Sequence, residues 1–142
     1  MRSIATVEGC WVVYADGASR GNPGPAAIGV VIFDDKNGER HRISEPIGRA
    51  TNNEAEYRAA IAGLEAALGL GARHVELRTD SELVVRQLDS RYRVRNPGLK
   101  RLFARMKDLR WRFASFTAVA IPREDNALAD KLANQALDRS GG

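Results

Sequence analysis

The sequence has very few of the residues that build thiolate metal sites, disulfide frameworks or histidine-based active sites. A single cysteine, Cys10, occurs in 142 residues, so no disulfide can form within the chain, and zinc sites with several thiolates are excluded. The two histidines, His41 and His74, fall in strand-like segments. We interpret Cys10 as a small, partly buried residue at the start of a strand, and both histidines as structural or exposed.

Long apolar runs and linkers are also missing. The longest nearly unbroken apolar stretch, residues 26–33, is far shorter than the roughly 20 residues that span a bilayer as a helix. The N-terminal segment lacks the apolar run of a secretory signal, which predicts a cytoplasmic protein. No internal repeat and no linker rich in proline, glycine or serine divides the chain, so we expect residues 1–142 to form a single domain.

Basic charge is concentrated in one segment. The chain carries 22 Lys and Arg against 18 Asp and Glu, for a formal net charge of +4. Residues 86–112 contain ten basic residues but only two acids, so this segment has a net charge of +8 and the rest of the chain −4. The basic residues are Arg86, Arg91, Arg93, Arg95, Lys100, Arg101, Arg105, Lys107, Arg110 and Arg112. A solvated helix face could produce such a run, but the asymmetry favours a surface that binds a polyanion.

The order of the predicted elements indicates an α/β fold. The predicted strands span residues 11–15, 27–33, 39–47, 75–79 and 111–121, and the predicted helices span residues 51–70, 81–88, 97–109 and 124–138. Thr51 followed by Glu54 predicts a capping box at the start of the first helix. A helix between two strands of one sheet implies parallel pairing. We therefore expect a mixed sheet, with the site beyond the carboxyl ends of its strands.

Two aspartates stand where predicted strands end. Asp16 follows residues 11–15 and Asp80 follows residues 75–79. If these two strands pair in parallel, both carboxylates emerge at the same edge of the sheet. Either aspartate alone is better explained as a turn or helix-capping residue.

Two further acids lie on predicted helices, at the edge of the face that packs. Glu56 is on the opposite side of its helix from Glu54 and lies among small residues, where an unpaired carboxylate is unfavourable and a metal ion or an arginine is the expected partner. Asp130 repeats this pattern, with Lys131 or an arginine as the alternative partner. Clustered carboxylates repel one another without a counter-charge. Oxygen ligands favour a hard cation such as Mg²⁺ or Mn²⁺.

Four segments resemble, in order, the motifs of the type 1 ribonuclease H family. They are DGASRGNPGP at residues 16–25, TNNEAEY at residues 51–57, TDS at residues 79–81 and NALADKLA at residues 126–133. One such segment alone is a weak signal, whereas four in the family's order over nearly the whole chain are specific. The resemblance implies a ribonuclease H-like fold, with a five-stranded mixed sheet whose second strand is antiparallel to the others, and helices on both faces.

The resemblance also implies a reaction and the residues that perform it. Members are endonucleases that hydrolyse the RNA strand of RNA–DNA hybrids with two Mg²⁺ ions, for which Mn²⁺ can substitute, and leave 5′-phosphate and 3′-hydroxyl ends. The motifs make Asp16, Glu56, Asp80 and Asp130 the catalytic and metal-binding residues, and Asn22, Thr51, Asn52 and Asn53 the residues that contact the hybrid. We expect a monomer that binds such hybrids and no membrane.

The chain departs from many family members at two places. The loop before the last aspartate, residues 121–125, contains no histidine. Its Pro-Arg-Glu sequence resembles a subgroup that lacks this residue, with Arg123 or Glu124 as candidates to replace part of its role. Residues 90–96 are too short for the basic protrusion of other members, so we expect the substrate to be held by Arg91, Arg93 and Arg95 and by the helix that follows.

Three other functions fit parts of the sequence. A nuclease of the wider superfamily that acts on DNA, such as a junction resolvase or a transposase core, is disfavoured by the TNNEAE arrangement. A module that binds hybrids or a partner without catalysis is disfavoured by the retention of all four acids. A nucleotide-binding domain is suggested by Gly17, Gly21 and Gly24, but their loop leads into a predicted strand and not into a helix.

Overall fold

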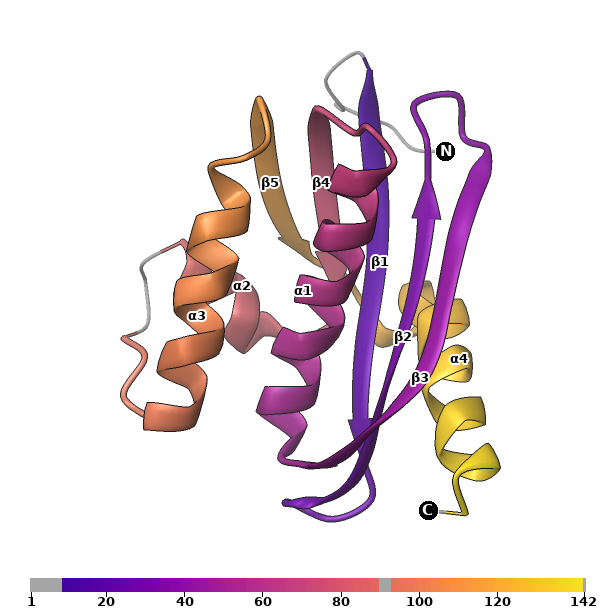
Figure 1. The fold of residues 1–142 in the computed structure, drawn as a ribbon, viewed down its shortest axis with the longest axis vertical. Coiled ribbons are helices and arrows are strands. Elements are labelled where there is room, and N and C mark those ends of the chain that lie inside the picture. The colour runs from indigo at the N-terminus through magenta and orange to yellow at the C-terminus, as the bar shows by residue number, and fades with distance from the viewer. Residues whose placement is uncertain (1–8, 90–92, 142) are drawn as a thin grey trace.

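The computed structural model describes residues 9–89 and 93–141, and Figure 1 shows their arrangement. The strands are β1 (Cys10–Ser19), β2 (Gly24–Phe33), β3 (Glu39–Ala50), β4 (His74–Thr79) and β5 (Ser115–Ala120). The helices are α1 (Asn52–Gly69), α2 (Glu82–Leu88), α3 (Pro97–Arg110) and α4 (Ala127–Arg139), and the short 3-10 helix η1 (Arg123–Asn126) precedes α4. The predicted order of elements is therefore confirmed.

The five strands form one mixed sheet in the order β3-β2-β1-β4-β5. β2 is antiparallel to both β1 and β3. β4 is parallel to both β1 and β5. Only β2 therefore runs against the other strands, as the sequence predicted.

Helices cover both faces of the sheet, with α1 and α3 on one face and α4 on the other (Figure 1). Two glycines show how closely the layers pack. A Cβ at Gly63 of α1 would lie 2.6 Å from a methyl of Val13, and a Cβ at Gly29 of β2 would lie 2.0 Å from the Ala129 carbonyl oxygen of α4. β2 is buried from Ala26 to Ile32 because both of its faces are covered, which explains its continuous apolar run.

The two largest differences from the predicted strand boundaries are at the end of β1 and the start of β5. β1 continues through Asp16 to Ser19 because its antiparallel pairing with β2 extends to Ala26, so Asp16 lies inside a strand and not at its end. β5 begins at Ser115 and not at Trp111, which caps the C-terminus of α3 and is 78% exposed. Pairing with β2 sets the first boundary and pairing with β4 sets the second, and local composition encodes neither.

The ends of α1 agree with the sequence. The Thr51 hydroxyl accepts a hydrogen bond from the Glu54 N–H, and the Glu54 carboxylate accepts one from the Thr51 N–H, which completes the predicted capping box. The chain leaves the helix through Gly71, whose φ of 100° favours glycine. None of the helices in the described residues is both long enough and apolar enough to cross a membrane.

Candidate active site

The site forms where two neighbouring strands separate. β1 and β4 pair in parallel as far as Ala15 and Thr79. Beyond these residues β4 ends and the chain turns toward α2, whereas β1 continues beside β2. Asp16 and Asp80 are the next residues of the two strands, so their side chains lie at a step in the sheet, where no strand covers them on one side.

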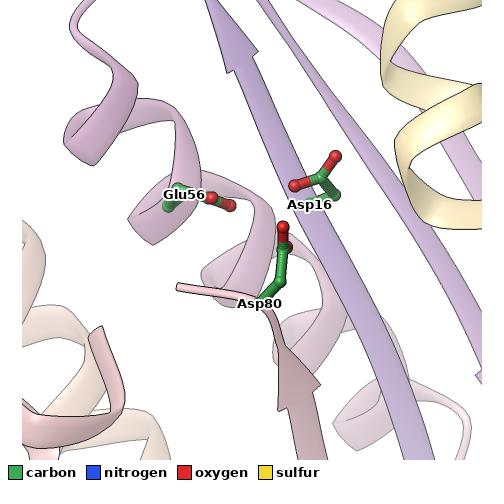
Figure 2. A group of neighbouring side chains, drawn as sticks. All are labelled: Asp16, Glu56 and Asp80. Atoms are coloured by element: carbon green, nitrogen blue, oxygen red, sulfur yellow. The ribbon is translucent and has the colours of Figure 1, made fainter. Parts of the chain in front are cut away.

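Three carboxylates meet at this step. Asp16, Glu56 and Asp80 each offer one oxygen, and the three oxygens lie within 4.8 Å of one another. Figure 2 shows the three side chains, which come from β1, α1 and the end of β4. Asp16 is only 5% exposed, although it carries an ionisable group. The predicted meeting of these three acids is therefore confirmed.

The position of Glu56 depends on a close approach between α1 and β1. The Gly17 N–H donates a hydrogen bond to the Glu56 carboxylate at 2.8 Å. A Cβ at Gly17 would lie 2.2 Å from the backbone carbon of Ala55, so only glycine allows this approach. The carboxylate thus has a backbone partner, whereas the sequence had suggested a metal ion or an arginine.

The cluster is electrostatically unfavourable by itself. The pKa of Asp16 is raised to about 10. Burial is the largest cause, and the negative charges of Glu56 and Asp80 add to it. Burial also raises the pKa of Glu56 to about 8, although the Gly17 N–H acts in the opposite direction. No ion pair to Asp16, Glu56 or Asp80 is formed within residues 9–89 and 93–141. Oxygen ligands that lack a basic partner fit a hard divalent cation such as Mg²⁺.

Asp130 lies beside this group and not within it. Its carboxylate accepts a hydrogen bond from the Asn134 side chain at 3.3 Å and lies 3.8 Å from the Arg123 guanidinium. Its proximity raises the pKa values of both Asp16 and Glu56. The arginine partner predicted as one alternative is therefore present. Arg123 itself is exposed, as is Glu124, the other proposed substitute for the absent histidine.

The predicted hybrid-contacting residues gather at the N-terminus of α1. The Asn22 side chain accepts a hydrogen bond from the Asn52 N–H at 3.0 Å, which joins the loop after β1 to this helix end. Thr51 is the capping residue, and Asn52 and Asn53 are exposed in the first turn. The two motifs that carry these residues are therefore neighbours in the fold.

The basic segment divides into two parts. Arg91 lies outside the described residues, and Arg93 and Arg95 are exposed on either side of the buried Val94. Farther along, Arg105 pairs with Glu65 and Asp108, and Arg112 also pairs with Asp108. Among the described residues, Arg93, Arg95, Lys100 and Arg101 form no ion pair. These four residues, in the middle of the segment, are thus available to a ligand, whereas Arg86, Arg105 and Arg112 form ion pairs within the protein.

A pocket of about 340 Å³ extends this available surface, and the sequence did not predict it. We call it the arginine pocket, because Arg49, Arg58 and Arg101 line it together with Glu54. All three arginines are exposed, and Arg58 donates a hydrogen bond to the Ile47 carbonyl at 3.3 Å. Arg49 and Arg58 come from β3 and α1, outside the basic segment, so the distribution of charge along the sequence did not predict their role. Only the packing of α3 beside α1 brings Arg101 to them.

The residues rejected as catalytic lie away from the carboxylates. His74 begins β4, at the opposite end of that strand from Asp80, and its ring contacts the Ser115 hydroxyl at 2.8 Å. His41 is exposed on β3. Cys10 is partly buried at the start of β1, and its thiol donates to the adjacent Trp11 carbonyl.

Comparison with known proteins gives one consistent family. Residues 14–136 match a family model described as reverse transcriptase-like. Ribonuclease HI of Halobacterium salinarum is 48% identical over 125 residues, and the crystal structure of that organism's RNase H1 superposes with a TM-score of 0.89 at 46% identity, covering 92% of this chain and 99% of that one. LC11-RNase H1, in a crystal structure with an RNA/DNA hybrid, superposes with a TM-score of 0.86 at 44% identity, covering 93% of this chain and 99% of that one.

The matches to two curated relatives cover most of this chain but a smaller share of each relative. The match to the Halobacterium protein covers 88% of this chain and 63% of that protein. The bifunctional protein Rv2228c of Mycobacterium tuberculosis is 44% identical over 128 residues, which are 89% of this chain and 35% of that protein.

Proposed function

Because the chain belongs to the type 1 ribonuclease H family, we propose that it is an endonuclease that hydrolyses the RNA strand of RNA–DNA hybrids. The observation that carries this proposal is the group formed by Asp16, Glu56 and Asp80, which three separate elements bring within 4.8 Å. A purely structural role for these acids would call for basic partners, and none is paired with them in the described residues. A site that takes up divalent cations accounts for both the geometry and the raised pKa values.

In the proposed mechanism Asp16, Glu56, Asp80 and Asp130 hold two Mg²⁺ ions, and Mn²⁺ can replace them. Bound ions of this kind activate water and stabilise charge on the leaving 3′ oxygen, which leaves 5′-phosphate and 3′-hydroxyl ends. Asp16 is the most buried of the four and would be shielded from water while it holds the ions. The Gly17 N–H holds Glu56 in place by its hydrogen bond, so the ligands are oriented before the substrate arrives.

Strand recognition is proposed to come from the end of α1. Asn22, Thr51, Asn52 and Asn53 lie together there, next to the turn that carries Glu56. Polar side chains at this place can contact the 2′-hydroxyls that distinguish RNA from DNA. Sequence preference is expected to be weak, because contacts to the backbone carry no base information.

The grip on the polyanion is proposed to rest on exposed basic side chains. Arg93 and Arg95 lie in the loop before α3, and the arginine pocket supplies three more guanidinium groups. Contacts of this kind release counterions, so affinity should fall steeply as salt increases. A single domain over residues 1–142, a monomeric state and a cytoplasmic location remain predictions, and so do the auxiliary roles of Arg123 and Glu124.

The direct test is cleavage of a hybrid with either the RNA or the DNA strand labelled, in Mg²⁺ and in Mn²⁺. Single-stranded RNA, double-stranded RNA and double-stranded DNA serve as competing substrates. The proposal predicts metal-dependent cutting of the RNA strand of the hybrid, with 5′-phosphate products. Cutting of duplex DNA in preference to the hybrid would instead indicate a DNA nuclease of the same fold, and binding without cutting would indicate a binding module.

A further inference from the structure

Asn126 stands at the N-cap position of α4, but its side chain does not form the hydrogen bonds expected of a helix cap. It is the residue before α4, where asparagine ordinarily accepts a hydrogen bond from the first turn of the helix. Its side chain forms no such bond, although Thr51, Ser81 and Asn96 cap the starts of α1, α2 and α3 in this way. The Asn126 side chain is instead almost completely buried, with 1% exposed.

The buried amide reaches the point where β1 and β4 separate. Its nitrogen donates to the Ala15 carbonyl oxygen at 2.9 Å and to the Asp80 carboxylate at 3.0 Å. Ala15 is the last residue of β1 to pair with β4, and Asp80 is the first residue beyond the end of β4. The Asn126 side chain therefore bridges the two strands where their ladder stops, and it joins the residue before Asp16 to Asp80.

Only the nitrogen of the Asn126 side-chain amide forms hydrogen bonds. Its nitrogen uses both hydrogens, whereas its oxygen has no hydrogen-bond partner among the described residues. A buried acceptor without a partner destabilises the fold, as does an unused capping position. Such departures from local consistency are expected where a residue serves the site.

We infer that Asn126 is a positioning residue that fixes the orientation of Asp80 and the rotation of α4 relative to the carboxylate cluster. A donor on one Asp80 oxygen restricts rotation of the carboxylate, and the bond to Ala15 anchors that donor to β1. Asp130 lies four residues further along, about one helical turn, so it shares the face of α4 that Asn126 holds against the sheet. One side chain thus relates the elements that carry Asp16, Asp80 and Asp130.

This inference rests on the proposed metal-dependent nuclease function, so its test measures ion binding as well as cleavage. Asn126→Ala removes both hydrogen bonds, and Asn126→Ser keeps a single donor. Ser44→Ala is the matched control, because the Ser44 hydroxyl donates to the Leu132 carbonyl at 2.6 Å and ties α4 to β3 without contacting a carboxylate. Mn²⁺ affinity is measured by calorimetry, cleavage by kcat and KM, and folding by thermal melting.

Asn126→Ala is expected to lower Mn²⁺ affinity and kcat by about 10- to 100-fold, the range for residues that orient metal ligands, with KM for the hybrid unchanged. Asn126→Ser should recover part of both losses, and Ser44→Ala should match the wild type in both even if it melts earlier. Wild-type Mn²⁺ affinity and kcat in Asn126→Ala would overturn the inference. If Asn126→Ala does not fold, the same comparison between Asn126→Ser and Ser44→Ala decides it. Failure of the wild-type protein to bind Mn²⁺ or to cut the hybrid would overturn the proposed function itself.

Discussion

The carboxylate cluster and the arginine pocket are built in opposite ways. Asp16, Glu56 and Asp80 are held within 4.8 Å by two strands and a helix, and Asp16 is almost completely buried. The arginine pocket is lined by long, exposed side chains that come from β3, α1 and α3. Negative charges are thus held close together by rigid elements in the carboxylate cluster. The positive charges of the arginine pocket are on long side chains that can move apart. Bond cleavage requires fixed ligands, whereas binding of a polyanion requires only positive charge in the right region.

The largest expected effect comes from removing one charge of the cluster. Asp80→Asn should lower cleavage by about 10²- to 10³-fold, because removal of one preorganised group at a reaction centre has an effect of this size. The variant can still accept the hydrogen bond from Asn126, so the metal-free protein should melt no earlier than the wild type. Cleavage rates and thermal melting in EDTA check both statements. A loss of several degrees in melting temperature would instead make Asp80 a structural residue.

Gly17→Ala should disturb the cluster through the backbone. The new methyl would meet the backbone of Ala55 and Glu56, so α1 must move away from β1 and the hydrogen bond to Glu56 is strained. Overpacking of this kind costs about 1–3 kcal/mol of stability, and activity should fall with it. Gly69→Ala is the control, since a Cβ there meets nothing within 4 Å. Equal urea midpoints for the two variants would contradict the close approach.

The cluster should also make the metal-free protein less stable at high pH. The pKa values of Asp16 and Glu56 rise from 3.8 and 4.5 to about 10 and about 8 on folding. The folded protein therefore binds these protons more tightly than the unfolded chain. Their contribution to the free energy of unfolding is complete below about pH 4, and it is lost as pH rises through the folded-state pKa values. Melting temperatures in EDTA should fall between pH 5 and pH 9, and Asp16→Asn should reduce this fall. The exposed Asp35→Asn should leave it unchanged, and an equal fall in all three proteins would contradict the account.

Changes in the arginine pocket should have smaller effects and act on binding. Arg101→Ala should raise KM for the hybrid several-fold at unchanged kcat and reduce the slope of log affinity against log salt by about one. Arg105→Ala is the control, because Arg105 is already paired with Glu65 and Asp108. A fall in kcat with constant KM would place Arg101 in the chemistry and remove the contrast between the two regions.

The smallest effect is expected at Arg123. Its guanidinium lies 3.8 Å from Asp130 and its side chain is 78% exposed, so the ion pair is largely screened by solvent. Arg123→Ala should change kcat by no more than about fivefold, since exposed pairs contribute about 0–1 kcal/mol. A loss as large as that of Asp80→Asn would mean that Arg123 takes the place of the absent loop histidine.

The cluster was more predictable than its surroundings. Asp16 and Asp80 each followed a recognisable strand, and Glu56 stood out because small residues surround it on a helix of regular pattern. The extension of β1 beyond Asp16 was missed because the glycine and proline content of residues 17–25 is typical of a turn, whereas residues 17–19 pair with β2. The position of Asp16 at a step inside the sheet, and not at a strand end, followed from that pairing.

Two other features depend on tertiary packing and gave no signal of their own. Arg49 and Arg58 lie in segments with ordinary charge, and only the approach of α3 places Arg101 next to them. Asn126 belongs to a recognised motif, but by its position alone it is an ordinary helix cap. Its contacts with Ala15 and Asp80 join residues more than 40 positions apart, which no local pattern specifies.

The carboxylate cluster is proposed to hold the divalent ions that cleavage needs. Calorimetric titration of the metal-free protein with Mn²⁺ at pH 7, in two buffers with different ionisation enthalpies and beside Asp80→Asn, measures this binding. Since burial keeps protons on Asp16 and Glu56 at this pH, the account predicts binding by the wild type with release of protons to the buffer, and an affinity at least about tenfold lower in the variant. Equal affinity in both proteins, or no binding to the wild type, would contradict it.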